Sequence, residues 1–109
     1  MKRTFVLIFT IAAAVVCCKT VSLAPTAQDE SIAKTKWADA NLDQLNAGYK
    51  LYTDNCGRCH KLHKPTEYDE TRWTKIVPWM GKKAELKETD QQLILHYLLA
   101  KRESLQQKK

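Results

Sequence analysis

Apolar residues recur every three or four positions in two stretches of the chain, which is the spacing of one face of an α-helix. The first stretch predicts a helix over residues 42–55, with Asn41 or Asp39 as its N-cap. The second predicts a helix over residues 90–105, where Thr89 and Gln92 resemble a capping box. The apolar positions are Leu42, Leu45, Tyr49 and Tyr52 in the first stretch and Leu93, Ile94, Tyr97, Leu98 and Leu105 in the second.

A shorter helix is expected between these two, over residues 67–76, where Trp73 and Ile76 are apolar. Pro78 should end or kink this helix, because proline lacks the N–H that the helical ladder needs. Gly48 lies in the middle of the first long helix, where glycine costs up to about 1 kcal/mol relative to alanine. Close approach of another helix would offset that cost, and Tyr97 is its expected partner. With every expected element helical, the sequence predicts an all-α domain.

The N-terminal stretch has the pattern of an export signal. Lys2 and Arg3 precede an apolar run over residues 5–16, which is too short to span a bilayer comfortably. The run ends at Cys17 and Cys18, and we expect one of them to become the acylated first residue of a lipoprotein. The alternative is an ordinary secreted protein whose two cysteines leave with the signal. Both interpretations divide the chain into a signal over residues 1–18, a polar tether over 19–40 and a domain over 41–107.

The tether assignment depends on composition, because residues 19–40 are polar and rich in helix breakers. Ile32 and Trp37 are the exceptions, and we expect Trp37 to pack back onto the domain. The chain has 109 residues and a net charge of +6. Lysines flank the middle of the domain and could steer acidic partner proteins or simply keep the surface soluble; nucleic-acid binding is not indicated. These lysines are Lys61, Lys64, Lys82, Lys83 and Lys87.

The strongest chemical signal is the run Cys56-Gly57-Arg58-Cys59-His60. Two cysteines two residues apart and followed at once by histidine are the attachment pattern for c-type haem. The two thiols would form thioethers with the porphyrin, and His60 would bind the iron. A disulfide redox pair would be expected after a strand, and none is predicted here. A zinc site would need a second pair of ligands, and the other two cysteines lie in the export signal.

The second iron ligand should be a soft donor downstream. Met80 is the only methionine after the initiator and precedes Gly81, so the chain can bend its thioether toward the iron. Filling a gap in the core is the ordinary alternative role of methionine. His63 is a rival that lies too close to His60 to reach the opposite face of a porphyrin. The second N–H of a metal-bound imidazole usually donates to a carbonyl or carboxylate, and we expect the carbonyl of Pro65 or of a neighbouring residue to accept it from His60.

The chain resembles the small single-haem class I cytochromes c of bacteria over about residues 41–105. The resemblance lies in Gly48-x-x-x-Tyr52-x-x-x-Cys56-x-x-Cys59-His60, then Trp73-x-x-x-Val77-x-x-Met80, then Ile94-x-x-Tyr97-Leu98. It implies a cytochrome c fold of three main helices around one covalent haem c. It also implies His60 and Met80 as axial ligands, with Tyr52 and Trp73 in the haem pocket.

The function implied by this resemblance is one-electron transfer by a protein that is not an enzyme, exported to the periplasm or anchored facing it. Its partners would be redox proteins. Two alternatives use the same haem: a gas sensor or minor peroxidase in which Met80 is not bound, and a tethered haem subunit of a larger oxidoreductase. A thiol–disulfide protein is a more distant alternative.

Overall fold

The computed structural model describes residue 14 and residues 21–109, so the export-signal and lipidation assignments, Cys17 and Cys18 included, lie outside the described residues. The described part of the chain is all-helical, with no strand, as the sequence predicts. It consists of α1 (Ala27–Lys36), α2 (Leu42–Asn55), α3 (Glu70–Lys83) and α4 (Glu88–Gln107). Among these residues, no helix combines the length and the apolar character that crossing a bilayer requires.

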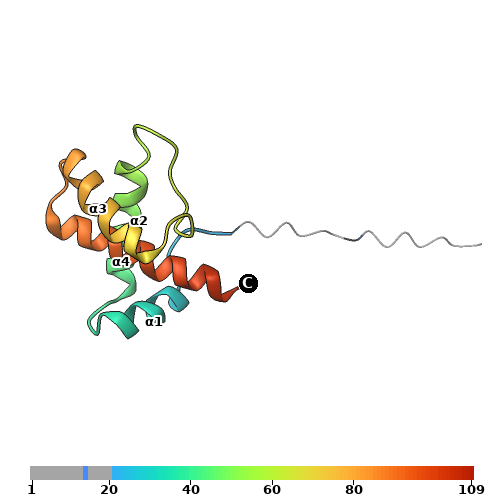
Figure 1. Cartoon of the computed structure of the whole chain (residues 1–109). Helices are drawn as coiled ribbons and strands as arrows, with labels where there is room; N and C mark the ends of the chain where they lie inside the picture. The colour runs from blue at the N-terminus through green and yellow to red at the C-terminus, as the bar shows by residue number, and fades with distance from the viewer. Residues whose placement is uncertain (1–13, 15–20) are drawn as a thin grey trace, which may run out of the picture.

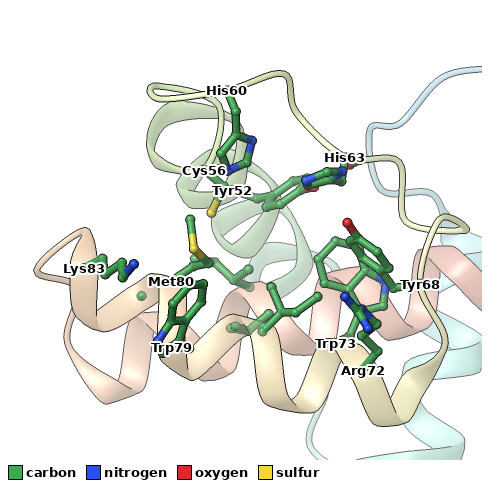
Figure 2. A pocket seen from close by; sticks show the side chains of 14 residues that line it. Tyr52, Cys56, His60, His63, Tyr68, Arg72, Trp73, Trp79, Met80 and Lys83 are labelled. Carbon is green, nitrogen blue, oxygen red and sulfur yellow. The ribbon is translucent and has the colours of Figure 1, made fainter.

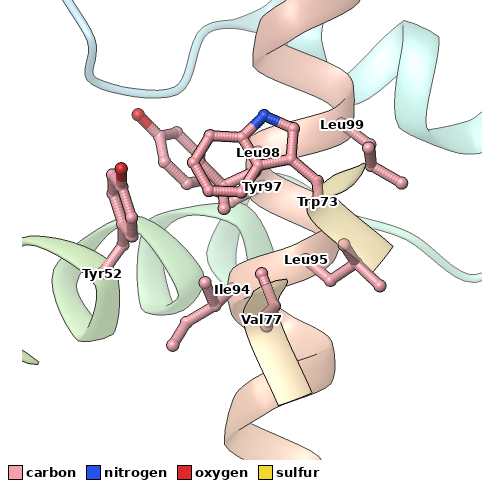
Figure 3. Close-up of a cluster of buried hydrophobic side chains, with 8 residues drawn as sticks. All are labelled: Tyr52, Trp73, Val77, Ile94, Leu95, Tyr97, Leu98 and Leu99. Atoms are coloured by element: carbon pink, nitrogen blue, oxygen red, sulfur yellow. The ribbon is translucent and has the colours of Figure 1, made fainter. Parts of the chain in front are cut away.

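Helix α4 is the centre of the arrangement, because α1, α2 and α3 each pack against it (Figure 1). The side chains at its contacts with α2 and α3 form a buried cluster in which rings from α2, α3 and α4 meet (Figure 3). Tyr52 of α2 meets Trp73 of α3 edge to face, with ring centroids 6.2 Å apart. The buried members are Tyr52, Trp73, Val77, Ile94, Leu95, Tyr97, Leu98 and Leu99.

The crossing of α2 over α4 explains the glycine in the middle of α2. A Cβ atom on Gly48 would lie 2.1 Å from the carbonyl oxygen of Leu93 and 3.0 Å from Cβ of Tyr97. Any side chain at this position would therefore collide with the α4 backbone. The expected approach of α4 at Gly48 is confirmed, and Tyr97 is its side-chain partner as predicted.

Local signals define the start of α2 correctly and that of α4 less well. Asn41 is the N-cap of α2, and its side chain accepts a hydrogen bond from the backbone N–H of Gln44 at 2.9 Å. The predicted capping box of Thr89 and Gln92 is wrong, because α4 begins at Glu88 and its N-cap, Lys87, makes no side-chain capping bond.

Helix α3 differs from its prediction, since it begins at Glu70, continues through Pro78 and ends at Lys83. Proline has a backbone φ compatible with a helix, and its missing N–H leaves only the carbonyl of Thr74 without its helical donor. Both residues are exposed, so water can reach that side of the helix. The helix stops one turn later, where Glu85 takes a φ of 59° and the N–H of Leu86 donates to the carbonyl of Gly81 at 2.9 Å.

The expectation of a tether over residues 19–40 does not hold for residues 27–36, which form α1. Ile32 and Ala33 are buried against α4 and the start of α2, in a cluster with Ala40, Leu45 and Ala100. Trp37 packs against this cluster as predicted. The polar composition of residues 19–40 suggested a tether because α1 has no broad apolar stripe. Its buried residues are only Asp29, Ile32 and Ala33.

Candidate functional site

Two adjoining cavities open where the end of α2 faces α3. Their volumes are about 430 Å³ and 470 Å³. Cys56, His60, Met80 and Lys83 line both, so the two cavities meet around these four side chains. Figure 2 shows the first cavity, with Cys56 and His60 above it and the side chains of α3 below. Volumes of this size are typical of sites for small molecules and cofactors.

The position of the cysteines follows from how α2 ends. Cys56 is the C-cap of α2, and its N–H donates to the carbonyl of Tyr52 at 2.9 Å. Arg58 then folds back, with its Nε donating to the carbonyl of Asp54 at 3.0 Å. Both thiols are free: Cys56 is half-buried, where burial raises the pKa of its thiol, and Cys59 is exposed in the second cavity.

His60 is exposed and lines both cavities, but its hydrogen bond differs from the prediction. Its Nδ1 lies 2.9 Å from the carbonyl oxygen of Lys61, not from that of Pro65. The Pro65 carbonyl instead accepts a buried hydrogen bond of 2.8 Å from Nε1 of Trp73. The correction has a simple cause, because the rigid turn at Pro65 points its carbonyl at the indole of α3. With Nδ1 protonated and bound to Lys61, Nε2 of His60 is left to act as a ligand.

Met80 reaches the same cavities from α3. Figure 2 shows its thioether pointing from α3 toward Cys56, with the His60 ring beyond. The residue is half-buried, although it belongs to a helix and not to the bend that the sequence suggested. The imidazole of His60 and the thioether of Met80 therefore face the same space from different segments.

The other two histidines have other partners. His63 shares a loop with His60, at a centroid distance of 5.1 Å, and its Nδ1 lies 2.9 Å from Oε1 of Glu67. The hydrogen bond from His63 lowers the pKa of the Glu67 carboxyl. His96 of α4 stacks on Trp37 at 3.7 Å and lines neither cavity.

The two aromatic residues proposed for the pocket, Tyr52 and Trp73, line the first cavity. Their polar atoms are already bound within the protein. The hydroxyl of Tyr52 donates to the carbonyl of His63, and the indole of Trp73 donates to Pro65. Burial raises the pKa of the Tyr52 hydroxyl well above its usual range, so it stays protonated. These residues supply an apolar wall and hold the loop that carries His60.

Two side chains of α3 that border the first cavity, Arg72 and Trp79, were not predicted from the sequence. Arg72 lies over the ring of Tyr68 at 5.1 Å, and Lys83 lies over that of Trp79 at 3.8 Å. The available signal for Arg72 was its helical spacing from Ile76 and Met80, at four and eight residues. Of the five lysines proposed as a rim, all are exposed, but Lys83 alone borders either cavity.

Comparisons of the chain with models of known protein families, with curated proteins and with solved structures find no match.

Proposed function

We propose that this chain is a one-electron carrier with the cytochrome c fold, holding one haem c covalently through Cys56 and Cys59. His60 and Met80 are the proposed axial ligands of the iron. The observation that supports this most directly is the meeting of two cavities around Cys56, His60 and Met80. Residues far apart in the sequence thus bring two free thiols, an imidazole and a thioether to one space, and this donor set suits a c-type haem.

Each residue has a distinct task in this proposal. Cys56 and Cys59 would hold the cofactor through two thioethers, and the contact of His60 Nδ1 with the Lys61 carbonyl leaves Nε2 as the atom that would bind the iron. The apolar side chains of Trp73, Val77 and Ile94 exclude water from one wall of the cavity.

Bound haem supplies the one-electron couple. The polypeptide holds, orients and tunes it. A thioether ligand and a water-poor wall both disfavour the extra positive charge of the ferric state, so Met80 and Trp73 should raise the reduction potential. With His60 and Met80 both bound, no coordination position stays open for oxygen or peroxide, which makes the protein a carrier and not an enzyme.

The exported protein, purified from a host with haem-attachment machinery, tests this proposal. A haem stain that survives a denaturing gel is expected for the natural chain and absent from the Cys56→Ser, Cys59→Ser variant. The oxidised protein should show the far-red iron–sulfur absorption band, and Met80→Ala should lose it. His96→Ala is the matched control for His60→Ala, because His96 lines neither cavity. A colourless protein with both thiols free would refute the proposal and favour thiol–disulfide chemistry.

A gas sensor or minor peroxidase is the second candidate, and the structural feature that favours it is Pro78. The proline removes the helical hydrogen bond to the carbonyl of Thr74, so the turn that precedes Met80 has one hydrogen bond fewer to hold the thioether in place. Rapid carbon monoxide binding with no far-red band would support this candidate. A tethered subunit of a larger oxidoreductase would instead keep the band and co-purify with its partners from solubilised membranes. Lipid on Cys18 or Cys17, a periplasmic location and acidic redox partners belong to the same proposal.

A further inference from the structure

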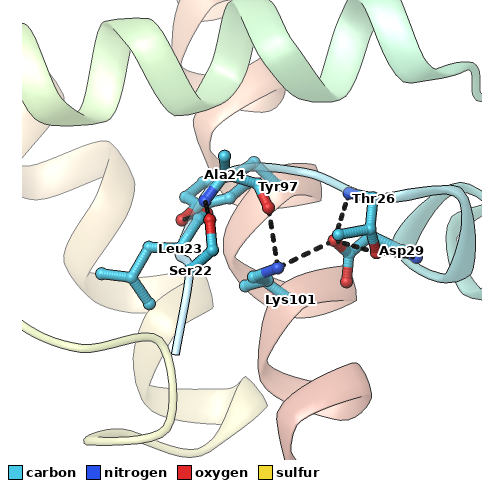
Figure 4. A network of polar contacts seen from close by, with 7 residues as sticks. All are labelled: Ser22, Leu23, Ala24, Thr26, Asp29, Tyr97 and Lys101. Carbon is cyan, nitrogen blue, oxygen red and sulfur yellow. Dashed lines mark hydrogen bonds and ion pairs between the residues drawn. The ribbon is translucent and has the colours of Figure 1, made fainter. Parts of the chain in front are cut away.

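A buried ion pair joins the first turn of α1 to α4, far along the chain from the cysteines. Nζ of Lys101 lies 3.0 Å from Oδ2 of Asp29, and both side chains are 1 % exposed (Figure 4). The same ammonium group donates to the carbonyl oxygen of Ala24 at 2.8 Å. A lysine this deeply buried is uncommon, and it stays charged only where such partners are fixed around it.

Asp29 serves α1 and α4 at the same time. Its Oδ2 accepts hydrogen bonds from the backbone N–H of Thr26 at 2.6 Å and from the Thr26 hydroxyl at 3.0 Å. The first of these bonds, together with the bond of 3.4 Å from the Asp29 N–H to the Thr26 hydroxyl, forms the capping box of α1. Oδ2 of Asp29 therefore contacts both the N-cap of α1 and the ammonium group of Lys101. This shared contact fixes the position of α1 along α4.

Tyr97 is the second point of attachment and lies one turn before Lys101 on α4. Its hydroxyl donates to the carbonyl oxygen of Leu23 at 2.7 Å. Its ring is buried, with a centroid 6.1 Å from that of Tyr52, and its Cβ lies at the crossing with Gly48. Tyr52 lines the first cavity and holds the carbonyl of His63. A continuous chain of contacts thus runs from Leu23 to the cavity wall.

We propose that the segment from Leu23 to Asp29, fixed to α4 by Tyr97 and Lys101, is a clamp that positions the cavity wall. Lys101, Asp29 and the hydroxyl of Tyr97 are then positioning residues. They hold the Tyr97 ring at the crossing, and that ring holds Tyr52 and the end of α2. The clamp is inferred from contacts within the protein, and it concerns what holds the cavity wall in place and not the transfer of electrons.

Amide hydrogen exchange of the intact, exported protein tests the clamp in two places. The variant Tyr97→Phe keeps the ring and loses only the hydroxyl, while Lys101→Met keeps the length of the side chain and loses the charge. Both should raise exchange at least tenfold in α1, residues 27–36, and also in the last two turns of α2, residues 49–55. Lys34→Ala is the control, because it removes the exposed ion pair of α1 with Glu30 and should change neither region by more than twofold.

Unchanged exchange of α1 in Tyr97→Phe would overturn the clamp. Faster exchange of α1 with no change in residues 49–55 would overturn the positioning role, because the segment would then be no more than a local attachment. Should Lys101→Met not fold, Tyr97→Phe still gives both results. Absence of haem from a purified protein that still unfolds cooperatively would refute the proposed function and leave the exchange result interpretable, since neither readout uses the cofactor.

Discussion

Replacing Gly48 by alanine should destabilise the domain, although alanine is the better helix former. The new Cβ would lie 2.1 Å from the carbonyl oxygen and 2.7 Å from the carbonyl carbon of Leu93, where ordinary contacts are 3.4 Å or longer. The neighbouring atoms belong to the α4 backbone, so they cannot move without the helix. The two helices would have to separate by more than an ångström.

The magnitude follows from two opposing contributions. Removing glycine from a helix interior gains up to about 1 kcal/mol. Overpacking typically costs about 1–3 kcal/mol, and a collision with backbone belongs at or above the upper end of that range. We therefore expect Gly48→Ala to lose about 2 kcal/mol net. Urea unfolding of the haem-loaded protein, followed by circular dichroism, should show a lower midpoint with an unchanged slope.

Two further glycines calibrate this measurement. A Cβ on Gly57 would meet Leu62 at 3.5 Å, an ordinary contact, and its φ is not positive, so Gly57→Ala should leave stability unchanged. A Cβ on Gly81 would lie 2.5 Å from Cγ of Gln91, a flexible side chain, so Gly81→Ala should fall between the other two. A Gly48→Ala protein as stable as the natural one would refute the close crossing of α2 and α4.

Four further outcomes are expected. Met80→Ala should abolish the far-red band and lower the reduction potential measured by redox titration, while His96→Ala leaves both unchanged. The Cys56→Ser, Cys59→Ser chain should show no cooperative thermal transition, because a domain of this size has a thin core without its cofactor. Proton NMR should show that the pKa of His96 is below its ordinary value of 6.5, because burial disfavours the charged imidazolium. The contribution of the neutral His96 ring to folding stability should be complete above pH 6.5 and should fall as the pH drops through the pKa of the folded state. Glu85→Gly should raise the free energy of unfolding by about 1 kcal/mol, because Glu85 has a left-handed φ of 59°.

The elements that the sequence predicted well are those whose signals are local. Helix α2 was expected over residues 42–55 and runs over Leu42–Asn55, because its apolar stripe and the cap at Asn41 both lie within it. The prediction for α3 is too short because proline usually ends a helix. Here Thr74, whose carbonyl loses its helical donor to Pro78, is exposed to water. The exposure of Pro78 depends on how α3 packs in the folded domain, so it could not be predicted from the neighbouring residues.

Some features of the candidate site also have local sequence signals, while others depend on how the helices pack. The spacing of Cys56, Cys59 and His60 is a local signal, and their common space with Met80 required only that α3 pass the end of α2. The acceptor of the Trp73 indole could not be predicted, because it depends on the direction of the Pro65 carbonyl. The loop around His60 is therefore held by contacts that appear only after α3 has packed.

The missed helix α1 changes what a lipid anchor would mean. Its only strong sequence signal was the pair Thr26 and Asp29, a capping box in an otherwise polar stretch. Because Leu23 is bound by Tyr97, a lipid on Cys18 would be joined to the domain by five residue steps, about 17 Å at full extension. A domain held that closely cannot swing far from the bilayer. A lipidated form should therefore exchange electrons most readily with a partner at the same membrane, and not with one that diffuses freely.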